Sequence, residues 1–274
     1  MELLLSPLFS GSSGNAVYVS AGQTGILVDA GVSCSRIVSE MKASGIDPAS
    51  LRAILITHEH SDHIAGAGIL SRKFGLPIYA TEGTWRAMEE KLGAVSAKNM
   101  RVIEAGQDFY IGDLDISPFS LPHDAADPCG YAFTCGRLRA AIATDIGCLR
   151  EGWLKAVSGC ELVLLEANYD PDMLKAGRYP YALKKRILST KGHLSNEDAG
   201  HAACRLAESG VRSLILGHLS KENNFPELAM ETVRLALTEA GVRLGTDVEL
   251  TVAARSHASG MFAVRDGFDL TRRA

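Results

Sequence analysis

The sequence predicts an α/β protein in which helices cover layers of β-sheet. Short apolar runs rich in branched residues alternate with amphipathic stretches along the chain. Hydrophobic residues make up 46% of the 274 residues and charged residues 22%, which is typical of a globular protein. No Pro-, Gly- or Ser-rich linker separates two halves. We therefore expect one domain over residues 1–274.

The first half of the chain alternates between predicted strands and helices. Its strands are apolar runs bounded by turn residues, at 3–8, 16–20, 25–29 and 51–57. A helix is expected at 33–44. Two further helices, at 62–74 and 84–92, are each followed by a glycine that can end them, Gly75 and Gly93.

The second half is richer in strands. Helices are expected at 196–209 and 226–240, where apolar residues recur with helical spacing. The remaining apolar runs are short enough for strands, at 102–104, 116–121, 131–134, 138–144, 162–166, 213–216, 249–253 and 260–264.

Charge and hydropathy exclude several classes of protein. The chain has 28 Lys and Arg against 32 Asp and Glu, a net charge of −4, so any contact with nucleic acid must use a local basic patch. No apolar run approaches the roughly 20 residues of a membrane span, and the amino terminus does not have the pattern of a signal peptide. The six cysteines form no Cys-x-x-Cys pair. We expect a cytoplasmic protein with reduced cysteines and no membrane contact. No pattern indicates an oligomeric state.

A metal-binding pattern follows the predicted strand at 51–57. It has the form His-x-His-x-Asp-His, with His58, His60, Asp62 and His63. Imidazole and carboxylate groups suit zinc, manganese or iron, and four such groups in six positions exceed what one segment supplies to one tetrahedral ion. His58 and His60 point the same way in an extended segment, whereas Asp62 and His63 enter a helix and turn aside. The pattern predicts two adjacent metal ions.

Further ligands are expected at the carboxyl ends of other strands, where sites collect in layered sheets. His123, Asp145 and His218 each follow a predicted strand. Any one of them alone could be a capping or surface residue. Together with the first motif, they favour a shared metal centre.

A basic segment precedes His193. Between Lys175 and His193 it contains six Lys and Arg residues, no Asp or Glu, and the aromatic residues Tyr179 and Tyr181. Positive charge and stacking faces favour nucleic-acid contact, although a solvated charged face has the same composition. The expected contacts are Lys184, Lys185, Arg186 and Lys191.

Two short loops also bear on the site. Ser12, Ser13 and Asn15 lie in a loop bounded by glycines and could donate to a phosphate, although a plain tight turn fits equally well. His193 precedes Ser195 and Asp198, which form a capping box at the start of the helix at 196–209.

The ligand pattern resembles the metallo-β-lactamase superfamily, which implies a four-layer αββα sandwich. The resemblance assigns one metal to His58, His60 and His123, and the other to Asp62, His63 and His218. It places Asp145 as the bridging ligand and a metal-bridging hydroxide as the nucleophile. It also matches Asp29 to an early aspartate that orients the ligand loop, although an ordinary carboxylate at a strand end fits that position as well.

Within the superfamily, the chain resembles the YycJ/WalJ group of the nuclease-like branch, close to RNase Z. The matching segments lie at 11–15, 57–63, 122–124, 143–145, 165–168, 192–195 and 216–224. The resemblance implies a dinuclear metal-dependent phosphodiesterase, favours DNA over RNA, and suggests an exonuclease acting from 5′ to 3′. It pairs Glu166 with His193 as a dyad that protonates the leaving oxygen, with Asp62 also in the catalytic set. A capping histidine beside a buried glutamate is the alternative for that pair.

Other activities share these ligands. A glyoxalase II type thioesterase or lactonase would need a small-molecule recognition region in place of the basic segment, and a cyclic-phosphate phosphodiesterase would use the same chemistry. A flavo-diiron oxidoreductase is disfavoured because that class has glutamate where this chain has His60. A non-catalytic DNA-binding protein is disfavoured because every expected ligand is present, Asp62 included.

Overall fold

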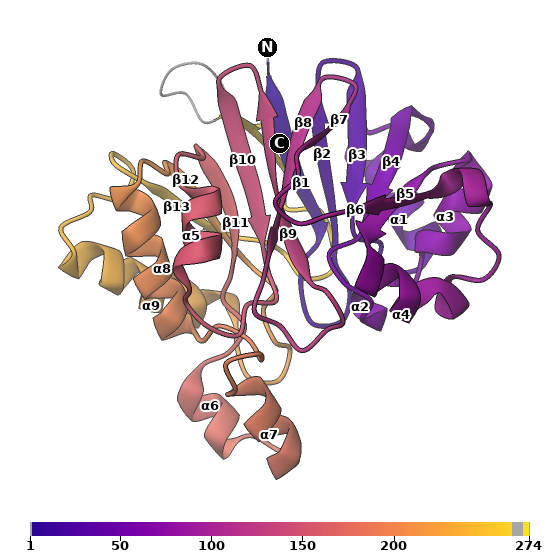
Figure 1. Ribbon diagram of the computed structural model, residues 1–274. Coiled ribbons are helices and arrows are strands. Elements are labelled where there is room, and N and C mark those ends of the chain that lie inside the picture. Colours follow the sequence, from indigo (N-terminus) through magenta and orange to yellow (C-terminus); the bar gives the residue numbers. More distant parts are fainter. Residues whose placement is uncertain (1, 265–270, 274) are drawn as a thin grey trace.

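Two mixed β-sheets pack face to face in the computed structural model, which describes residues 2–264 and 271–273 (Figure 1). The first sheet contains, in spatial order, β15 (Thr271–Arg273), β14 (Met261–Val264), β1 (Leu3–Phe9), β2 (Ala16–Ala21), β3 (Thr24–Val28), β4 (Leu51–Leu55), β5 (Ile78–Thr81) and β6 (Met100–Ile103). The second contains β13 (Glu249–Val252), β12 (Ser213–Gly217), β11 (Leu162–Glu166), β10 (Leu138–Ala143), β9 (Cys129–Cys135), β8 (Leu114–Ser120) and β7 (Phe109–Ile111).

Helices cover the outer face of each sheet (Figure 1). On the first sheet lie α1 (Cys34–Ala43), α3 (Ala67–Phe74) and α4 (Glu82–Leu92), which share one apolar cluster with its strands. On the second lie α5 (Glu151–Val157), α8 (Asn196–Glu208) and α9 (Pro226–Glu239), which share another. The order helix, sheet, sheet, helix confirms the expected αββα sandwich.

The alternation of side chains along the strands connects these layers. In β11, Leu162 and Leu164 belong to the cluster between the two sheets, while Val163 and Leu165 belong to the cluster beneath the helices. Because successive residues of a strand face opposite sides, a strand covered on both faces must be apolar throughout. We propose that the two sheets, which share this inner cluster, fold as one domain. The expected domain covers residues 1–274, of which residues 1, 265–270 and 274 lie outside the described part of the chain.

Strand direction brings the site loops to one edge. β10, β11 and β12 are parallel to one another, and β3 and β4 are parallel in the other sheet. β8 runs antiparallel to β9, which runs antiparallel to β10, so β8 points the same way as β10. The loops that leave these strands at their carboxyl ends therefore meet at the same edge.

One predicted helix is divided in the structure, and this corrects the expectation of a continuous helix at 62–74. It consists of α2 (Ser61–Ile64) and α3, separated at Ala65 and Gly66. The Gly66 amide donates to Ala30 O at 2.7 Å, and a Cβ on Gly66 would lie 2.3 Å from Val32 O. The chain approaches a neighbouring loop so closely here that the helix is interrupted.

Several short elements were not predicted. Besides β5, β7 and α5, they include the 3-10 turns η1 (Pro48–Ser50) and η2 (Ala97–Asn99). The basic segment, for which no secondary structure was expected, contains α7 (Tyr181–Ile187) and begins at the end of α6 (Pro171–Ala176). Figure 1 shows α6 and α7 together, extending from the edge that carries the site loops. No helix within the described residues is both long enough and apolar enough to cross a bilayer.

Candidate metal centre

The seven residues predicted to bind metal lie in loops that follow strands of both sheets. The loop after β4 continues into α2 and carries four of them, and the others follow β8, β10 and β12. All seven belong to groups whose candidate ligand atoms lie within 4.8 Å of one another: His58, His60, Asp62, His63, His123, Asp145 and His218. The fold thus brings together residues that are up to 160 positions apart, counted from His58 to His218.

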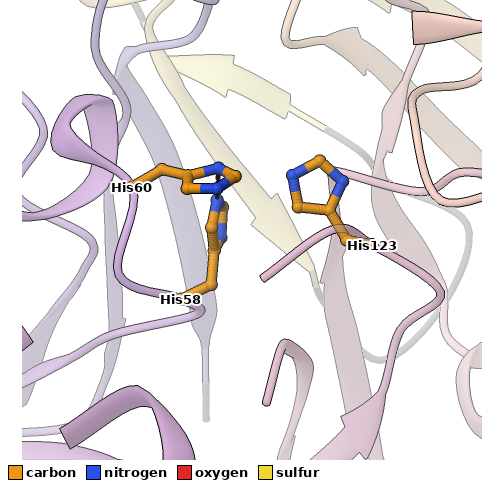
Figure 2. A group of neighbouring side chains, drawn as sticks. All are labelled: His58, His60 and His123. Carbon is orange, nitrogen blue, oxygen red and sulfur yellow. Dashed lines mark hydrogen bonds between the residues drawn. The ribbon is translucent and has the colours of Figure 1, made fainter. Parts of the chain in front are cut away.

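His58, His60 and His123 form the first group. His58 Nε2 lies 3.0 Å from His60 Nδ1, and the His123 ring centroid lies 5.0 Å from that of His58 and 5.2 Å from that of His60. Figure 2 shows His58 and His60 in contact, with His123 directed toward them from the other sheet. Three imidazoles in this arrangement can coordinate one metal ion.

Asp62, His63 and His218 form the second group. The Asp62 Oδ2 atom lies 3.7 Å from His63 Nε2, and the rings of His63 and His218 stack with centroids 5.7 Å apart. His63 and His218 are buried, whereas the Asp62 side chain is one-quarter exposed. This group offers a mixed carboxylate and imidazole site.

Asp145 lies between the two groups. Its Oδ2 atom is 3.4 Å from His63 Nε2, and its Oδ1 atom is 3.4 Å from His218 Nε2 and 3.7 Å from His123 Nε2. Burial raises the pKa of Asp145, but the surrounding histidines together outweigh it and hold the pKa well below its usual value. A carboxylate ionised in this position can contact both groups at once.

The donor set fits divalent metal ions. His123 Nε2 and Asp145 Oδ2 are buried, and neither has a hydrogen-bond partner among the residues that the structure describes. Such atoms are rare in a folded protein unless an ion or ligand completes them. Burial also lowers the pKa of His58 and of His123, so both rings favour the neutral form that binds metal. The clusters are therefore consistent with a dinuclear metal site.

Asp29 is hydrogen-bonded to the loop that carries four of the candidate ligands. Its Oδ1 atom accepts from Thr57 N at 2.8 Å, and its Oδ2 atom accepts from Thr57 Oγ1 and from His63 Nδ1, both at 2.8 Å. The bond to Nδ1 directs His63 Nε2 toward Asp145. Burial disfavours a charged His63 ring, but the nearby carboxylates, Asp29 foremost, raise its pKa to about 10. The carboxylates around His63 thus favour positive charge at this position, and a bound metal ion would supply that charge in place of the proton.

Three site residues have a left-handed backbone. Asp29, Asp145 and His218, with φ of 60°, 63° and 55°, are the only non-glycine residues with positive φ among those described. Each lies one or two residues beyond the last residue of a strand. This conformation costs roughly 1–3 kcal/mol per residue and persists where the surroundings enforce it. His218 N donates to Ser10 Oγ at 3.0 Å, and Asp29 N donates to Leu55 O at 2.8 Å.

Glu166 and His193 are in direct contact. The Glu166 Oε1 atom accepts from His193 Nδ1 at 2.7 Å, and its Oε2 atom accepts from Ile146 N at 2.7 Å and from Leu194 N at 3.0 Å. Glu166 is fully buried, whereas the His193 side chain is 19% exposed. Burial opposes the charged ring, but the charge and hydrogen bond of Glu166 prevail and raise the pKa of His193 to about 9. His193 is therefore protonated at neutral pH.

A cavity of about 360 Å³ opens over the two groups. Its floor includes His60, Asp62, Asp145, His193 and His218. One wall comes from the basic segment, and its residues are Tyr179, Leu183, Arg186, Ile187 and Gly192. The carbonyl of Gly192 also accepts from His123 Nδ1 at 2.9 Å, so the segment contacts the metal-binding residues directly.

The basic residues of this segment are placed differently from one another. Arg186 lines the cavity and binds Asp124 through two hydrogen bonds. Lys184 Nζ donates to Lys175 O at 2.6 Å within the segment. Lys185 and Lys191 are exposed and lie outside the lining of the cavity. Only Arg186 of the four expected contacts is thus part of the cavity wall.

The loop at 11–15 contributes less to the cavity than expected. Ser12 lines the cavity and Ser13 is exposed outside it. Asn15, the third residue expected to contact a phosphate, lies outside the cavity lining, and its side chain is buried and hydrogen-bonded within the protein. Its Oδ1 atom accepts from Gly11 N at 3.1 Å, and its Nδ2 atom lies 3.1 Å from His63 Nε2. In this structure the Asn15 side chain therefore contacts the loop of candidate ligands and not the cavity.

Asp124, Asn168 and Ser220 line the cavity but were assigned no role from the sequence. Asp124 directly follows the candidate ligand His123, and this adjacency is the one signal that could have identified it. The role of the Gly192 carbonyl could not be read from residue types, because every residue has a carbonyl.

Comparisons with known proteins agree with this geometry. A family model described as the beta-lactamase superfamily domain matches residues 24–219. The exodeoxyribonuclease WalJ of Streptococcus pneumoniae serotype 2 is 42% identical over 247 residues, covering 89% of this chain and 92% of that protein. The exodeoxyribonuclease YycJ of Bacillus anthracis is 39% identical over 250 residues, covering 91% and 95%. The crystal structure of YhfI from Bacillus subtilis, a metallo-beta-lactamase fold protein, superposes with a TM-score of 0.68 at 17% identity, covering 94% of this chain and 99% of that one.

The chain belongs to the metallo-β-lactamase superfamily, and its metal-binding clusters mark it as a metal-dependent hydrolase. Within the superfamily it is close to the WalJ and YycJ exodeoxyribonucleases, to which it is similar over about nine-tenths of its length. The resemblance expected from its motifs is thus confirmed.

Proposed function

We propose that this protein is a dinuclear metal-dependent phosphodiesterase that degrades DNA as an exonuclease, working from 5′ to 3′. One observation carries the proposal: two ligand groups joined by Asp145 lie under a cavity with a basic wall, in a chain similar over nine-tenths of its length to two exodeoxyribonucleases. The proposed direction of degradation, from the 5′ end of the DNA toward the 3′ end, rests on the resemblance of the motifs to that group.

His58, His60 and His123 would hold one ion, and Asp62, His63 and His218 the other, with Asp145 shared between them. Zinc, manganese and iron all suit these donors. When bound, two such ions lower the pKa of a water molecule and offset negative charge on a phosphodiester that is under attack. Asp29 would keep His63 in the tautomer that presents Nε2.

His193 would protonate the leaving oxygen. Its side chain lines the cavity beside Asp145, and its raised pKa keeps a proton available at neutral pH. Glu166 would hold the ring in one orientation through Nδ1, so that Nε2 carries the proton to be donated. Removal of either residue should slow bond cleavage more than it weakens substrate binding.

The basic wall supports a polyanionic substrate. Arg186 lies in the cavity, and Lys185, Lys191 and Tyr181 are exposed on the same segment. Tyr181 is 82% exposed, so its ring is free to stack on a base. A thioester or a lactone without a phosphate has no group that matches this positive charge.

The test is degradation of DNA labelled at either end by the purified protein loaded with manganese or zinc. We expect metal-dependent loss of DNA, with the 5′ label released first, and no turnover in the Asp145→Ala and Asp62→Ala variants. A thioester, a lactone and a cyclic nucleotide serve as controls. Turnover confined to any of these controls would refute the DNA substrate, and full activity in Asp145→Ala would refute the shared ligand.

A further inference from the structure

Arg186 and Asp124 form a two-pronged ion pair at the rim of the cavity. Arg186 Nη2 donates to Asp124 Oδ1 at 3.0 Å, and Arg186 Nε donates to Asp124 Oδ2. Both residues line the cavity. The pair links α7 to the loop that carries His123, so it joins the basic segment to the metal-binding residues.

The guanidinium fork binds a phosphate with the same geometry as a carboxylate. In the structure, the carboxylate of Asp124 occupies both prongs of that fork. The Arg186 side chain is 50% exposed and that of Asp124 is 26% exposed. An ion pair as exposed as this contributes little net stability, so exchange of one anion for another meets little resistance.

Asp124 also lies beside a candidate metal ligand. Its Oδ1 atom lies 3.4 Å from His123 Nε2, one of the buried atoms without a hydrogen-bond partner in the described part of the chain. If Arg186 turned to another anion, the Asp124 carboxylate would still face the group formed by His58, His60 and His123. A divalent metal ion held by that group would offset its negative charge, which further lowers the cost of the exchange.

We propose that Asp124 occupies the phosphate-binding fork of Arg186 in the free protein and is displaced by a phosphodiester of the substrate. This inference rests on the proposed function and concerns the regulation of the same site. Asp124 competes with every anion for Arg186, so it lowers the affinity of the cavity for a lone phosphate. A polynucleotide, which also reaches the exposed Lys185 and Lys191, has additional contacts with which to displace it.

The test is a double-mutant cycle with Asp124→Asn and Arg186→Gln. The probe is a short fluorescein-labelled oligodeoxythymidine with phosphorothioate linkages, which resist cleavage, and binding is followed by fluorescence anisotropy. The full-length protein is measured zinc-loaded and again metal-free, so that any effect on metal binding is separated from the effect on the probe. Asp124→Ala is a second variant for the case that Asn still engages Arg186.

We expect Asp124→Asn to tighten binding by about 5-fold in the parent protein, the upper range for release of an exposed ion pair. In the Arg186→Gln background the tightening should shrink to less than about 2-fold, because no fork remains to be released. The logarithm of the binding constant falls linearly with the logarithm of the salt concentration, and Arg186→Gln alone should reduce the magnitude of this salt slope by about 0.7. Asp172→Asn is the matched control, since Asp172 forms an exposed pair with Lys175 at 3.3 Å outside the cavity.

Two results would overturn the inference. Equal tightening by Asp124→Asn in both backgrounds would mean that Asp124 acts through its charge alone, and absence of tightening in the parent would mean that no competition exists. Failure of the parent protein to bind the oligonucleotide at all would refute the proposed DNA substrate as well, so the two failures are distinguishable.

Discussion

The Glu166 carboxylate lies 2.7 Å from His193 Nδ1 and directs that ring toward the cavity. A buried carboxylate is stable only when its oxygens are well hydrogen-bonded. Here the second oxygen accepts two backbone amides, from Ile146 and Leu194, which come from the loops on either side. These hydrogen bonds fix the position of Glu166, and Glu166 in turn fixes the His193 ring. The protonation state of that ring decides whether His193 can donate a proton.

We expect the rate of DNA cleavage to fall as pH rises through the pKa of His193, about 9, because the ring then loses the proton that it donates. Glu166→Gln removes the charge that raises this pKa, so the alkaline fall should move to lower pH. His193→Gln should lower the rate roughly 100-fold or more and remove that fall. The measurement is kcat/KM against pH for the zinc-loaded protein. An alkaline limb that is the same in all three proteins would exclude His193 as the proton donor.

Asp29→Asn should weaken metal binding by about 10- to 100-fold, because Asn cannot match the charged acceptor for His63 Nδ1. Asn tolerates the left-handed backbone of this position, so the loop itself should be preserved. The affinity is measured by competition with a zinc chelator. Asp113→Asn is the control, because Asp113 also accepts from backbone and hydroxyl groups, at Gln23 and Thr24, on an exposed turn outside the site. Equal losses in both variants would argue against a role of Asp29 in the metal centre.

The exposed lysines of the basic segment should strengthen DNA binding through their positive charge alone, without directional contacts to particular groups. Replacing Lys185 and Lys191 together with Gln should weaken oligonucleotide binding and reduce its salt slope by about 1.4, the value for two phosphate contacts on a single strand. Lys42 and Lys98, which are also exposed but lie in α1 and η2, form the control pair. If both double variants change the slope by the same amount, the basic segment holds no special position toward DNA.

Gly31 is needed where three segments of the site meet. A Cβ there would lie 1.6 Å from Asp62 O and 2.6 Å from Asn15 N. Both are backbone atoms, and Asn15 N donates a hydrogen bond to Asp62 O at 2.8 Å. Gly31→Ala should therefore lower the free energy of unfolding by about 1–3 kcal/mol and weaken metal binding. Gly152→Ala, in α5 with nothing within 4 Å of the added methyl group, should stabilise the protein by about 0.5 kcal/mol. Urea denaturation of both variants checks the two signs, and a neutral Gly31→Ala would contradict the tight packing of this loop.

The grouping of the candidate ligands was predictable from the sequence, because their positions depend on local order. A strand places its last residues at the sheet edge, and the spacing of His58, His60 and His63 after such a strand needs no knowledge of the rest of the fold. The alternation of apolar runs and amphipathic stretches predicted the layered fold for the same reason. The division of the helix at Gly66 was missed, because its cause is a contact with Ala30 and Val32, more than thirty residues earlier.

By itself, the sequence predicted a layered α/β fold, a set of candidate metal ligands and a basic segment, because these follow from periodicity, strand ends and composition. The four-layer sandwich was predicted from the resemblance of the motifs to a known superfamily. Only the tertiary structure decided how these parts meet. Asn15 faces inward to His63, Arg186 holds Asp124, and the Gly192 carbonyl binds His123. These contacts join residues far apart in the chain through hydrogen bonds whose partners depend on the packing of both sheets. No local sequence pattern predicts contacts between such distant residues. The partners of Asn15, Arg186 and Gly192 could therefore be identified only from the tertiary structure.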